Sequence, residues 1–266
     1  MQTVFITGCA NGIGKHLAQC FYEKGYYCIC TDIDLPTLQA QTKSWDAKRF
    51  VALALDVRDA QSWQNIINTL PVIDILVNNA GVIIPDFLEK MTIQAIDFQI
   101  DVNLKGMMYG TNLIGQKMIG QGHGHIINLA SLAGIAPVHG LGVYAASKHG
   151  VRGFTLSIAH ELKQKGVKIA CICPDLVNTN MLTLQLDYQA AALTFSGNKK
   201  ALSVVDIEKA VFERALTHNE LEICVPRHRG WMGKVANLFP QSNAWLIDLL
   251  FKKGLKQQKA TLDATH

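Results

Sequence analysis

The sequence is poor in charge, in disulfide-forming cysteine patterns and in long apolar runs. Charged residues make up only 17% of the 266 residues, against about 25% in typical chains. Seven cysteines in a chain this long do not form a disulfide framework and indicate buried thiols in a reducing compartment. Apolar runs stop short of the roughly 20 residues that a membrane helix needs, and no leader pattern precedes the first apolar run. A cytoplasmic protein is therefore expected, rather than a secreted or membrane-spanning one.

The net charge of +4 is unevenly distributed along the chain. Residues 1–226 carry 18 Lys/Arg and 19 Asp/Glu, a net charge of −1, whereas residues 227–266 carry seven basic and two acidic residues, a net charge of +5. A basic face with a nucleic-acid-binding motif is absent from the first 226 residues, so nucleic acid is not an expected partner. The pattern predicts a dinucleotide-binding and catalytic domain at 1–226 and a basic, amphipathic C-terminal extension at 227–266.

Short β-branched runs alternate with longer stretches of helical period, which predicts one α/β domain. Strands are expected at 2–7, 26–31, 50–55, 73–77, 124–130, 167–173 and 221–225, and helices at 12–24, 35–44, 59–69, 91–120, 142–165 and 204–217. Right-handed crossovers then give a single Rossmann-like, doubly wound parallel sheet of about seven strands with helices on both faces. Residues 178–202 are expected to form a mobile segment that covers a site.

A glycine-rich turn, residues 7–14 (TGCANGIG), follows the first expected strand and opens the first helix. Glycines there allow a tight turn and let the backbone approach a pyrophosphate at the helix N-terminus. The alternative is an ordinary connection between a strand and a helix. Two further polar stretches, Asp56-Val57 and Asn78 to Gly81, follow the third and fourth strands, at the sheet edge where ligands bind in open α/β folds.

Asp32 ends the second expected strand, 18 residues beyond Gly14, where an acid accepts hydrogen bonds from the adenosine ribose hydroxyls. Its carboxylate would repel a 2′-phosphate, and no Arg or Lys occupies 31–35. NAD is therefore the expected cofactor, with NADP as the alternative. Lys15 is the residue that would favour NADP, and Asp34 is a weaker candidate for the ribose ligand than Asp32.

Tyr144 and Lys148 are four residues apart, which places the phenol and the ammonium on one face of a helix. Free tyrosine has a pKa near 10 and a nearby cation lowers it, so Lys148 is expected to lower the pKa of Tyr144. Ser131 ends the fifth expected strand, 13 residues before Tyr144, and its hydroxyl can bind a substrate oxygen. Taken alone, the pair would be a surface coincidence and the serine a turn former.

The sequence resembles the short-chain dehydrogenase/reductase family over about residues 1–225. The resemblance lies in the glycine turn, Asp56, Asn78-Asn79-Ala80-Gly81, Asn103, Ser131, Tyr144-x-x-x-Lys148 and Pro174. It implies a nicotinamide-dependent oxidoreductase with Tyr144 as general acid/base, Lys148 holding the nicotinamide ribose, Ser131 positioning the substrate oxygen and Asn103 anchoring a relay water. The cofactor-binding residues are then Gly8, Asn11, Gly12, Ile13, Gly14, Asp32, Asp56, Val57, Asn78, Ala80, Gly81, Tyr144, Lys148, Val177 and Thr179. A homodimer or homotetramer through the helices at 91–120 and 142–165 is also implied.

The chain departs from the family pattern after the sixth strand, where Asp175 stands in place of the usual glycine after Pro174. A glycine there lets the backbone pass close to the nicotinamide, whereas Asp175 adds a side chain and a charge. The departure concerns cofactor geometry and pocket shape rather than the class of reaction.

Several apolar residues are candidates for a hydrophobic substrate pocket, although core packing explains some of them equally well: Ile83, Leu132, Val138, Leu141, Leu176, Met181, Leu182 and Leu184. His139 is a candidate for substrate contact. No metal site is expected, because His123 and His125 lack a third ligand and His160-Glu161 lacks the second histidine of a zinc helix.

The predicted function is an NAD-preferring oxidoreductase acting on a hydrophobic alcohol or carbonyl compound, with a dinucleotide sensor or a membrane-associated scaffold as alternatives. A helix at 244–259 would place Leu246, Ile247, Leu250, Phe251 and Leu255 on one face and lysines on the other. With Trp231 and Trp245, that face would suit the surface of an anionic membrane, at the inner face of which the enzyme would then lie. The alternative is a tail helix that packs on its own domain or on a partner subunit.

Overall fold

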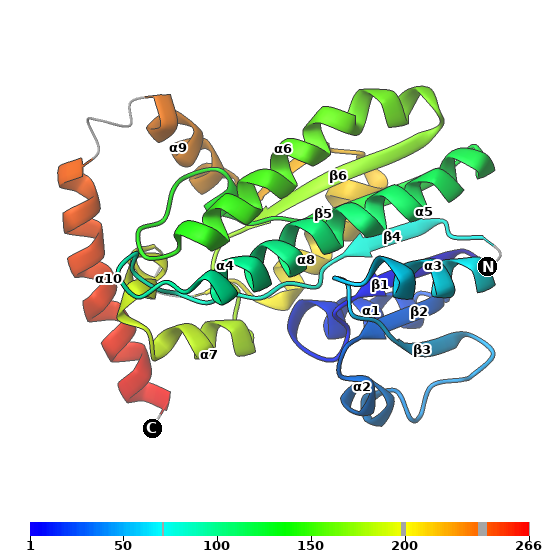
Figure 1. Ribbon diagram of the computed structural model, residues 1–266, viewed down its shortest axis with the longest axis horizontal. Coiled ribbons are helices and arrows are strands. Elements are labelled where there is room, and N and C mark those ends of the chain that lie inside the picture. The colour runs from blue at the N-terminus through cyan, green and yellow to red at the C-terminus, as the bar shows by residue number, and fades with distance from the viewer. Residues whose placement is uncertain (71, 198–200, 239–243, 266) are drawn as a thin grey trace.

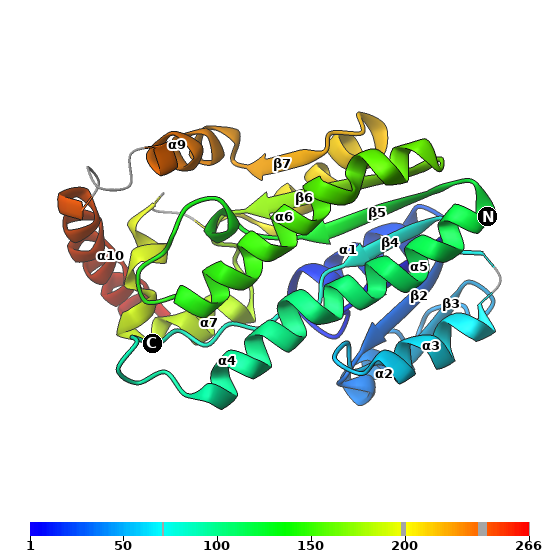
Figure 2. The ribbon, with the colours of Figure 1, turned by 45° about the horizontal axis from the view of Figure 1, so that its top comes forward.

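Seven parallel strands form one sheet in the order β3-β2-β1-β4-β5-β6-β7, the doubly wound arrangement expected from the sequence (Figure 1; β7 is labelled in Figure 2). The computed structural model describes residues 1–70, 72–197, 201–238 and 244–265. All seven expected strands are confirmed, each within two residues at either end: β1 Thr3–Thr7, β2 Tyr27–Asp32, β3 Phe50–Ala54, β4 Ile75–Asn78, β5 Gly124–Leu129, β6 Val167–Pro174 and β7 Glu222–Val225.

Helices cover both faces of the sheet, and each layer buries its own apolar cluster. On one face lie α1 (Gly12–Glu23), α2 (Leu35–Gln41), α8 (Val204–Lys209) and the π-helical η4 (Ala210–Thr217), with Leu17, Phe21 and Val211 in the core. On the other lie α3 (Ala60–Thr69), α4 (Ile93–Ile100), the π-helical η1 (Asp101–Gly106), α5 (Met107–Gln121) and α6 (Gly142–Gln164), with Trp63, Ile114 and Leu162 in the core. The helices α7 (Asn180–Leu186) and α10 (Ala244–Thr265), described below, lie beyond the carboxyl ends of the central strands rather than in either layer (Figure 2).

The segment 178–202 folds instead of forming the mobile loop that its composition suggested. It contains α7 (Asn180–Leu186) and the 3₁₀ helix η3 (Gln189–Ser196), and residues 198–200 lie outside the described part of the chain. Ala191 and Ala192 are completely buried. The reason is long-range, because a helix from the end of the chain covers η3.

That covering helix is α10 (Ala244–Thr265), which confirms the helix expected in the extension. The sequence left open whether this helix lies on a membrane or packs against protein, and in the structure it packs on its own domain. The Phe251 ring contacts the rings of Phe87 and His139, with centroids 6.4 and 5.5 Å away. A Cβ on Gly254 would lie 2.0 Å from the carbonyl oxygen of Ala192, so only glycine allows this close approach.

The apolar face of α10 is therefore not available to lipid in the way that the membrane hypothesis required. Its lysines remain exposed on the opposite face: Lys252, Lys253, Lys256 and Lys259. The side chains of Trp245 and Leu246, which that hypothesis also used, lie outside the described part of the structure. Among the described residues, no helix is both long and apolar enough to cross a membrane.

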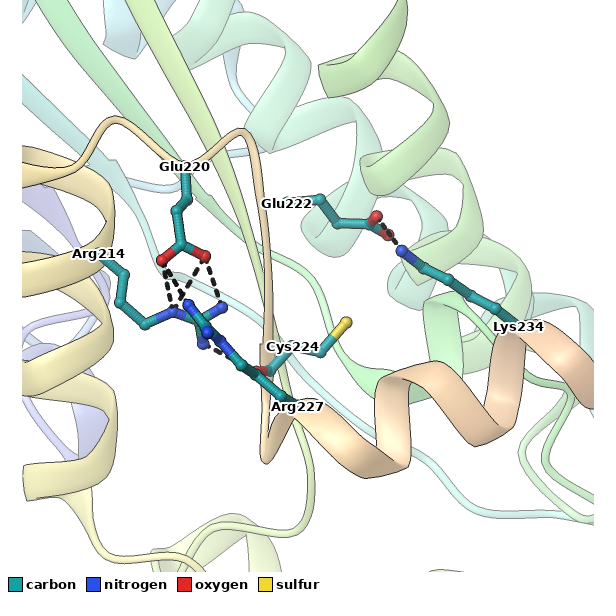
Figure 3. A network of polar contacts seen from close by, with 6 residues as sticks. All are labelled: Arg214, Glu220, Glu222, Cys224, Arg227 and Lys234. Atoms are coloured by element: carbon teal, nitrogen blue, oxygen red, sulfur yellow. Dashed lines mark hydrogen bonds and ion pairs between the residues drawn. The ribbon is translucent and has the colours of Figure 1, made fainter.

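The sequence did not indicate α9 (Arg227–Leu238), which joins β7 to the end of the extension. Figure 3 shows how its basic residues pair with acidic residues of the body. The Arg227 guanidinium donates to Glu220 at 2.8 Å, and Lys234 donates to Glu222. Arg214 also binds Glu220, and it donates to the Cys224 carbonyl at 2.9 Å. Part of the positive charge of the extension is thus neutralised by the rest of the chain.

Gln258 provides a test of the packing of α10, because its buried side-chain amide donates to the carbonyls of Gln185 (2.8 Å), Leu186 (3.2 Å) and Tyr188 (2.8 Å). Replacing it by leucine removes these hydrogen bonds from a buried contact, so we expect Gln258→Leu to lower the free energy of unfolding by about 1–3 kcal/mol. Urea denaturation measures this. The control is Lys253→Leu on the exposed face. Equal stability of the two variants would show that α10 does not pack on α7 and η3 in solution.

Candidate active site

One cavity of about 900 Å³ runs along the carboxyl ends of the strands, from the glycine turn after β1 to the helices of the extension. Most of the residues expected to bind cofactor or substrate line it. From the catalytic motif it includes Ser131, Tyr144 and Lys148. From the expected cofactor set it includes Gly8, Asn11, Gly12, Ile13, Asp32, Asp56, Val57, Ala80, Gly81, Val177 and Thr179.

The glycine turn has the shape of a phosphate cradle. Gly8 and Gly12 have positive φ angles of 72° and 57°, which a glycine adopts without strain. Gly14 does not line the cavity but allows the turn to close, since a Cβ there would lie 2.0 Å from the Gly8 carbonyl oxygen. The Asn11 side chain does not cap α1, so the first N–H groups of that helix are available to an anion. The turn therefore fits a dinucleotide pyrophosphate.

The end of β4 is fastened to this turn by Asn79, which the sequence analysis quoted but did not select. Its Nδ2 donates to the carbonyls of Thr7 (2.9 Å) and Gly8 (3.0 Å), while Thr7 Oγ1 accepts from the backbone N–H groups of Asn79 and Ala80. Asn78, by contrast, points into the core away from the cavity, where it donates to Asn128 and Thr111. Alternation along the strand explains why only one of the two faces the ligand side.

The two acids at the ends of β2 and β3 both line the cavity. Asp32 accepts from the Ala10 N–H at 2.7 Å and from the Asp34 N–H at 2.9 Å, so its carboxylate lies beside the glycine turn. Asp56 binds the Arg58 guanidinium, and this hydrogen bond lowers the pKa of the carboxyl. Lys15, the residue that would favour NADP, lines a separate small hollow, and Asp34 caps α2.

Tyr144 and Lys148 are both buried and both line the cavity. The Lys148 ammonium donates to the Leu129 carbonyl at 2.9 Å and lies 5.7 Å from the centre of the Tyr144 ring. Burial raises the pKa of Tyr144 to about 12, an effect partly offset by a hydrogen bond with Ser131. Burial also lowers the pKa of Lys148 to about 8. The net pKa of Tyr144 is therefore raised in the protein alone, opposite to the direction expected from the neighbouring lysine, because desolvation dominates.

Asn103 lies behind the cavity in the π-helical turn η1, rather than on its wall. Its Oδ1 accepts from the Val82 N–H at 2.7 Å, and its Nδ2 donates to the Val82 carbonyl and to Ser147 Oγ. A Cβ on Gly81 would lie 3.3 Å from Asn103 Oδ1 and 3.6 Å from Lys148 Nζ. The amide thus fixes the loop after β4 next to the buried lysine.

Much of the cavity wall is apolar. All eight residues proposed for a hydrophobic pocket line it: Ile83, Leu132, Val138, Leu141, Leu176, Met181, Leu182 and Leu184. His139 does not, because its ring packs between Phe87 and Phe251. The extension adds residues that the sequence analysis missed, among them Arg229, Met232, Ile247 and Leu250. Only the amphipathic pattern of α10 could have indicated any of these.

The histidines first considered as metal ligands have other partners or surroundings. His123 binds Asp74 at 3.1 Å, and burial lowers the pKa of His125 to about 4. A different group, His16, Cys20 and Glu208, has its ligand atoms within 4.8 Å of one another. It lies between α1 and α8 and does not line the cavity, and the His16–Glu208 hydrogen bond of 2.9 Å joins these two helices.

Comparison with known proteins agrees with this geometry. A family model described as short chain dehydrogenase matches residues 2–189. The chain is 34% identical over 217 residues to the NADP-dependent 3-hydroxy acid dehydrogenase YdfG of Salmonella typhi, which covers 79% of this chain and 87% of that protein. It is 33% identical over 186 residues to the (2S)-[(R)-hydroxy(phenyl)methyl]succinyl-CoA dehydrogenase subunit BbsD of Thauera aromatica, covering 68% and 75% of the two chains.

Solved structures show the same relationship. The closed form of serine dehydrogenase complexed with NADP+ superposes with a TM-score of 0.76 and 29% identity over 84% of this chain and 94% of that one. A short chain dehydrogenase/reductase from Burkholderia phymatum in complex with NAD gives 0.74 and 25% over 84% and 88%. This chain belongs to the short-chain dehydrogenase/reductase family of nicotinamide-dependent oxidoreductases.

Proposed function

We propose that this chain interconverts a hydrophobic alcohol and its carbonyl compound, with NAD preferred over NADP. The substrate would be a secondary alcohol and its ketone, or a long-chain alcohol and its aldehyde. One observation carries the proposal: the Tyr144 phenol, the Ser131 hydroxyl and the Lys148 ammonium line the same cavity as eight apolar side chains. The polar groups suit an oxygen at the reacting carbon, and the apolar ones suit the rest of the substrate.

A bound nicotinamide dinucleotide supplies or accepts the hydride. The glycine turn and the helix N-terminus behind it would hold its pyrophosphate. Asp32 would bind the adenosine ribose, and Asp56 with Val57 would lie along the adenine. Ala80, Gly81, Val177, Thr179 and Lys148 would surround the nicotinamide half. Asn78 and Gly14 would act indirectly, through the core and the closure of the turn.

Ser131 and Tyr144 would handle the proton on the substrate oxygen. With a pKa raised to about 12, the phenol stays protonated at neutral pH and can donate to a carbonyl oxygen during reduction. Lys148, with a pKa near 8, is mainly charged at neutral pH and would stabilise the phenolate that forms. Asn103 would keep the loop after β4 in place and anchor a water of the proton relay.

NAD preference follows from the position of Asp32. Its carboxylate lies at the glycine turn, while Lys15 is directed to another hollow and Arg58 is bound to Asp56. A 2′-phosphate would therefore meet a negative charge with no free cation next to it among these residues. Because relatives with NADP in their names share this fold, the preference for NAD over NADP is tested directly below.

The quaternary state, compartment and domain division are part of the same proposal. We expect a cytoplasmic homo-oligomer that associates through α5 and α6, with residues 1–226 as the catalytic domain and 227–266 as an extension. Membrane contact through the apolar face of α10 is not included, because that face packs on the body of the same chain.

Tyr144→Phe tests the catalytic role. We expect turnover of octanol with NAD, and of octanal with NADH, to fall by roughly 100- to 10,000-fold, because the variant has no proton to transfer. Binding of NADH, followed by its fluorescence, should change little. A variant as active as the wild type, or a wild type inactive on neutral alcohols, ketones and aldehydes of all chain lengths, would contradict the proposed function.

Asp32→Ser tests cofactor choice. Wild-type kcat/KM should favour NAD, and the variant should shift the NAD-to-NADP ratio toward NADP by on the order of tenfold or more, because the repulsion of the 2′-phosphate is removed. Asp34→Ser is the control, since Asp34 is exposed and caps α2 without lining the cavity. Initial rates with each cofactor give the ratios. Faster turnover with NADP by the wild type would refute the argument from Asp32.

A further inference from the structure

An ion pair between Asp175 and Arg229 lies on the wall of the cavity. Asp175 follows directly after β6, in the position where the family usually has glycine, and its N–H donates to the Val225 carbonyl at 2.8 Å. Arg229 is in the first turn of α9, and its Nη1 donates to Asp175 Oδ2. The side chains are only 16% and 27% exposed, so the pair is largely shielded from water.

Arg229 is held in place by more than its charge. A Cβ on Gly197, at the end of η3, would lie 1.9 Å from Arg229 Nη1 and 2.8 Å from its Cζ. The guanidinium therefore lies directly against the backbone of Gly197. The Arg229 side chain, which belongs to the extension, thus contacts both the residue after β6 and the residue after η3.

Within the described part of the chain, the other charged residues that line the cavity lie on other elements than the Asp175–Arg229 pair and have contacts of their own. Asp32 lies beside the glycine turn, Asp56 binds Arg58 at the end of β3, and Lys148 is buried against the Leu129 carbonyl. At the end of the cavity bounded by α9 and α10, Arg229 is thus the cation that an acidic substrate would meet. Arg229 is already paired with the Asp175 carboxylate.

We infer that Asp175 determines the charge class of the substrate by neutralising Arg229, so that the pocket binds uncharged alcohols and carbonyl compounds and rejects carboxylates. This inference rests on the proposed function and specifies its substrate class. A carboxylate that entered would have to displace Asp175 from Arg229, and it would leave the Asp175 carboxylate without a partner in a shielded site. An uncharged substrate leaves the pair intact.

The same argument predicts what happens when the Asp175 charge is removed. Asp175→Asn keeps the size of the side chain and an oxygen acceptor for Arg229, but it leaves the positive charge of the guanidinium uncompensated. A carboxylate can then form a charge-assisted hydrogen bond with Arg229. We expect carboxylate binding to tighten by on the order of 10-fold or more, while binding of the matched alcohol changes little.

The test compares ligands of equal chain length: hexanoate with hexanol, octanoate with octanol and decanoate with decanol. Their dissociation constants for the full chain with NADH, which cannot take a hydride from an alcohol, are measured by isothermal titration calorimetry, a readout independent of turnover. In Asp175→Asn the carboxylate affinity should rise relative to the alcohol, and in the double variant Asp175→Asn/Arg229→Met the gain should disappear. Asp187→Asn is the control, because Asp187 is an exposed acid next to α7 that does not line the cavity.

Three results would overturn the inference. The first is that the wild type binds octanoate as tightly as octanol, and the second is that Asp175→Asn leaves the carboxylate-to-alcohol ratio unchanged. A gain that persists in the double variant would show that Arg229 is not the group that binds the carboxylate, which also refutes it. Turnover of neutral alcohols by the wild type is measured separately, so a failure of the proposed function is distinguished from a failure of this inference.

Discussion

A buried lysine ammonium at the end of β5 is the interaction on which the arrangement of the site depends. Lys148 can be held there because the Leu129 carbonyl accepts from it at 2.9 Å. The turn after Ser131 packs closely on the same helix, since a Cβ on Gly134 would lie 2.5 Å from the Lys148 carbonyl oxygen. This approach brings Ser131 next to Tyr144. Burial makes ionisation of the phenol costly, so the protein alone favours a neutral tyrosine beside a cation.

The C-terminal extension acts as a wall of the site rather than as a separate appendage. Its helix α9 is fastened to the body by ion pairs from Arg227 and Arg229, and α10 packs on η3 through Gly254 and Gln258. Met232, Ile247 and Leu250 then face the cavity. Some of the basic residues that distinguish the extension in the sequence thus form ion pairs with acidic side chains of residues 1–226. In the proposed account, the pair of Asp175 and Arg229 serves both to attach the extension and to select the substrate.

The sequence predicted what depends on local periodicity and on short motifs. All seven strands, the glycine turn and the eight apolar pocket residues are where the sequence placed them, because alternation and strand ends determine these positions locally. It did not predict α9, or the ordering of 178–202, which depends on packing against α10. It selected Asn78 where Asn79 faces the cavity, and it considered His139 as a candidate for substrate contact, whereas the ring contacts Phe251. The pKa of Tyr144 was misjudged because desolvation cannot be read from spacing.

In the proposed reaction, hydride moves between the nicotinamide and the carbonyl carbon of an uncharged substrate in this cavity. The most direct measurement uses NADH carrying deuterium on its C4 position, with octanal as the acceptor and mass spectrometry of the alcohol produced. The account predicts octanol with deuterium on its first carbon. Octanol without deuterium from either face of the labelled nicotinamide, or no reduction of octanal or of any other neutral aldehyde or ketone, would contradict it.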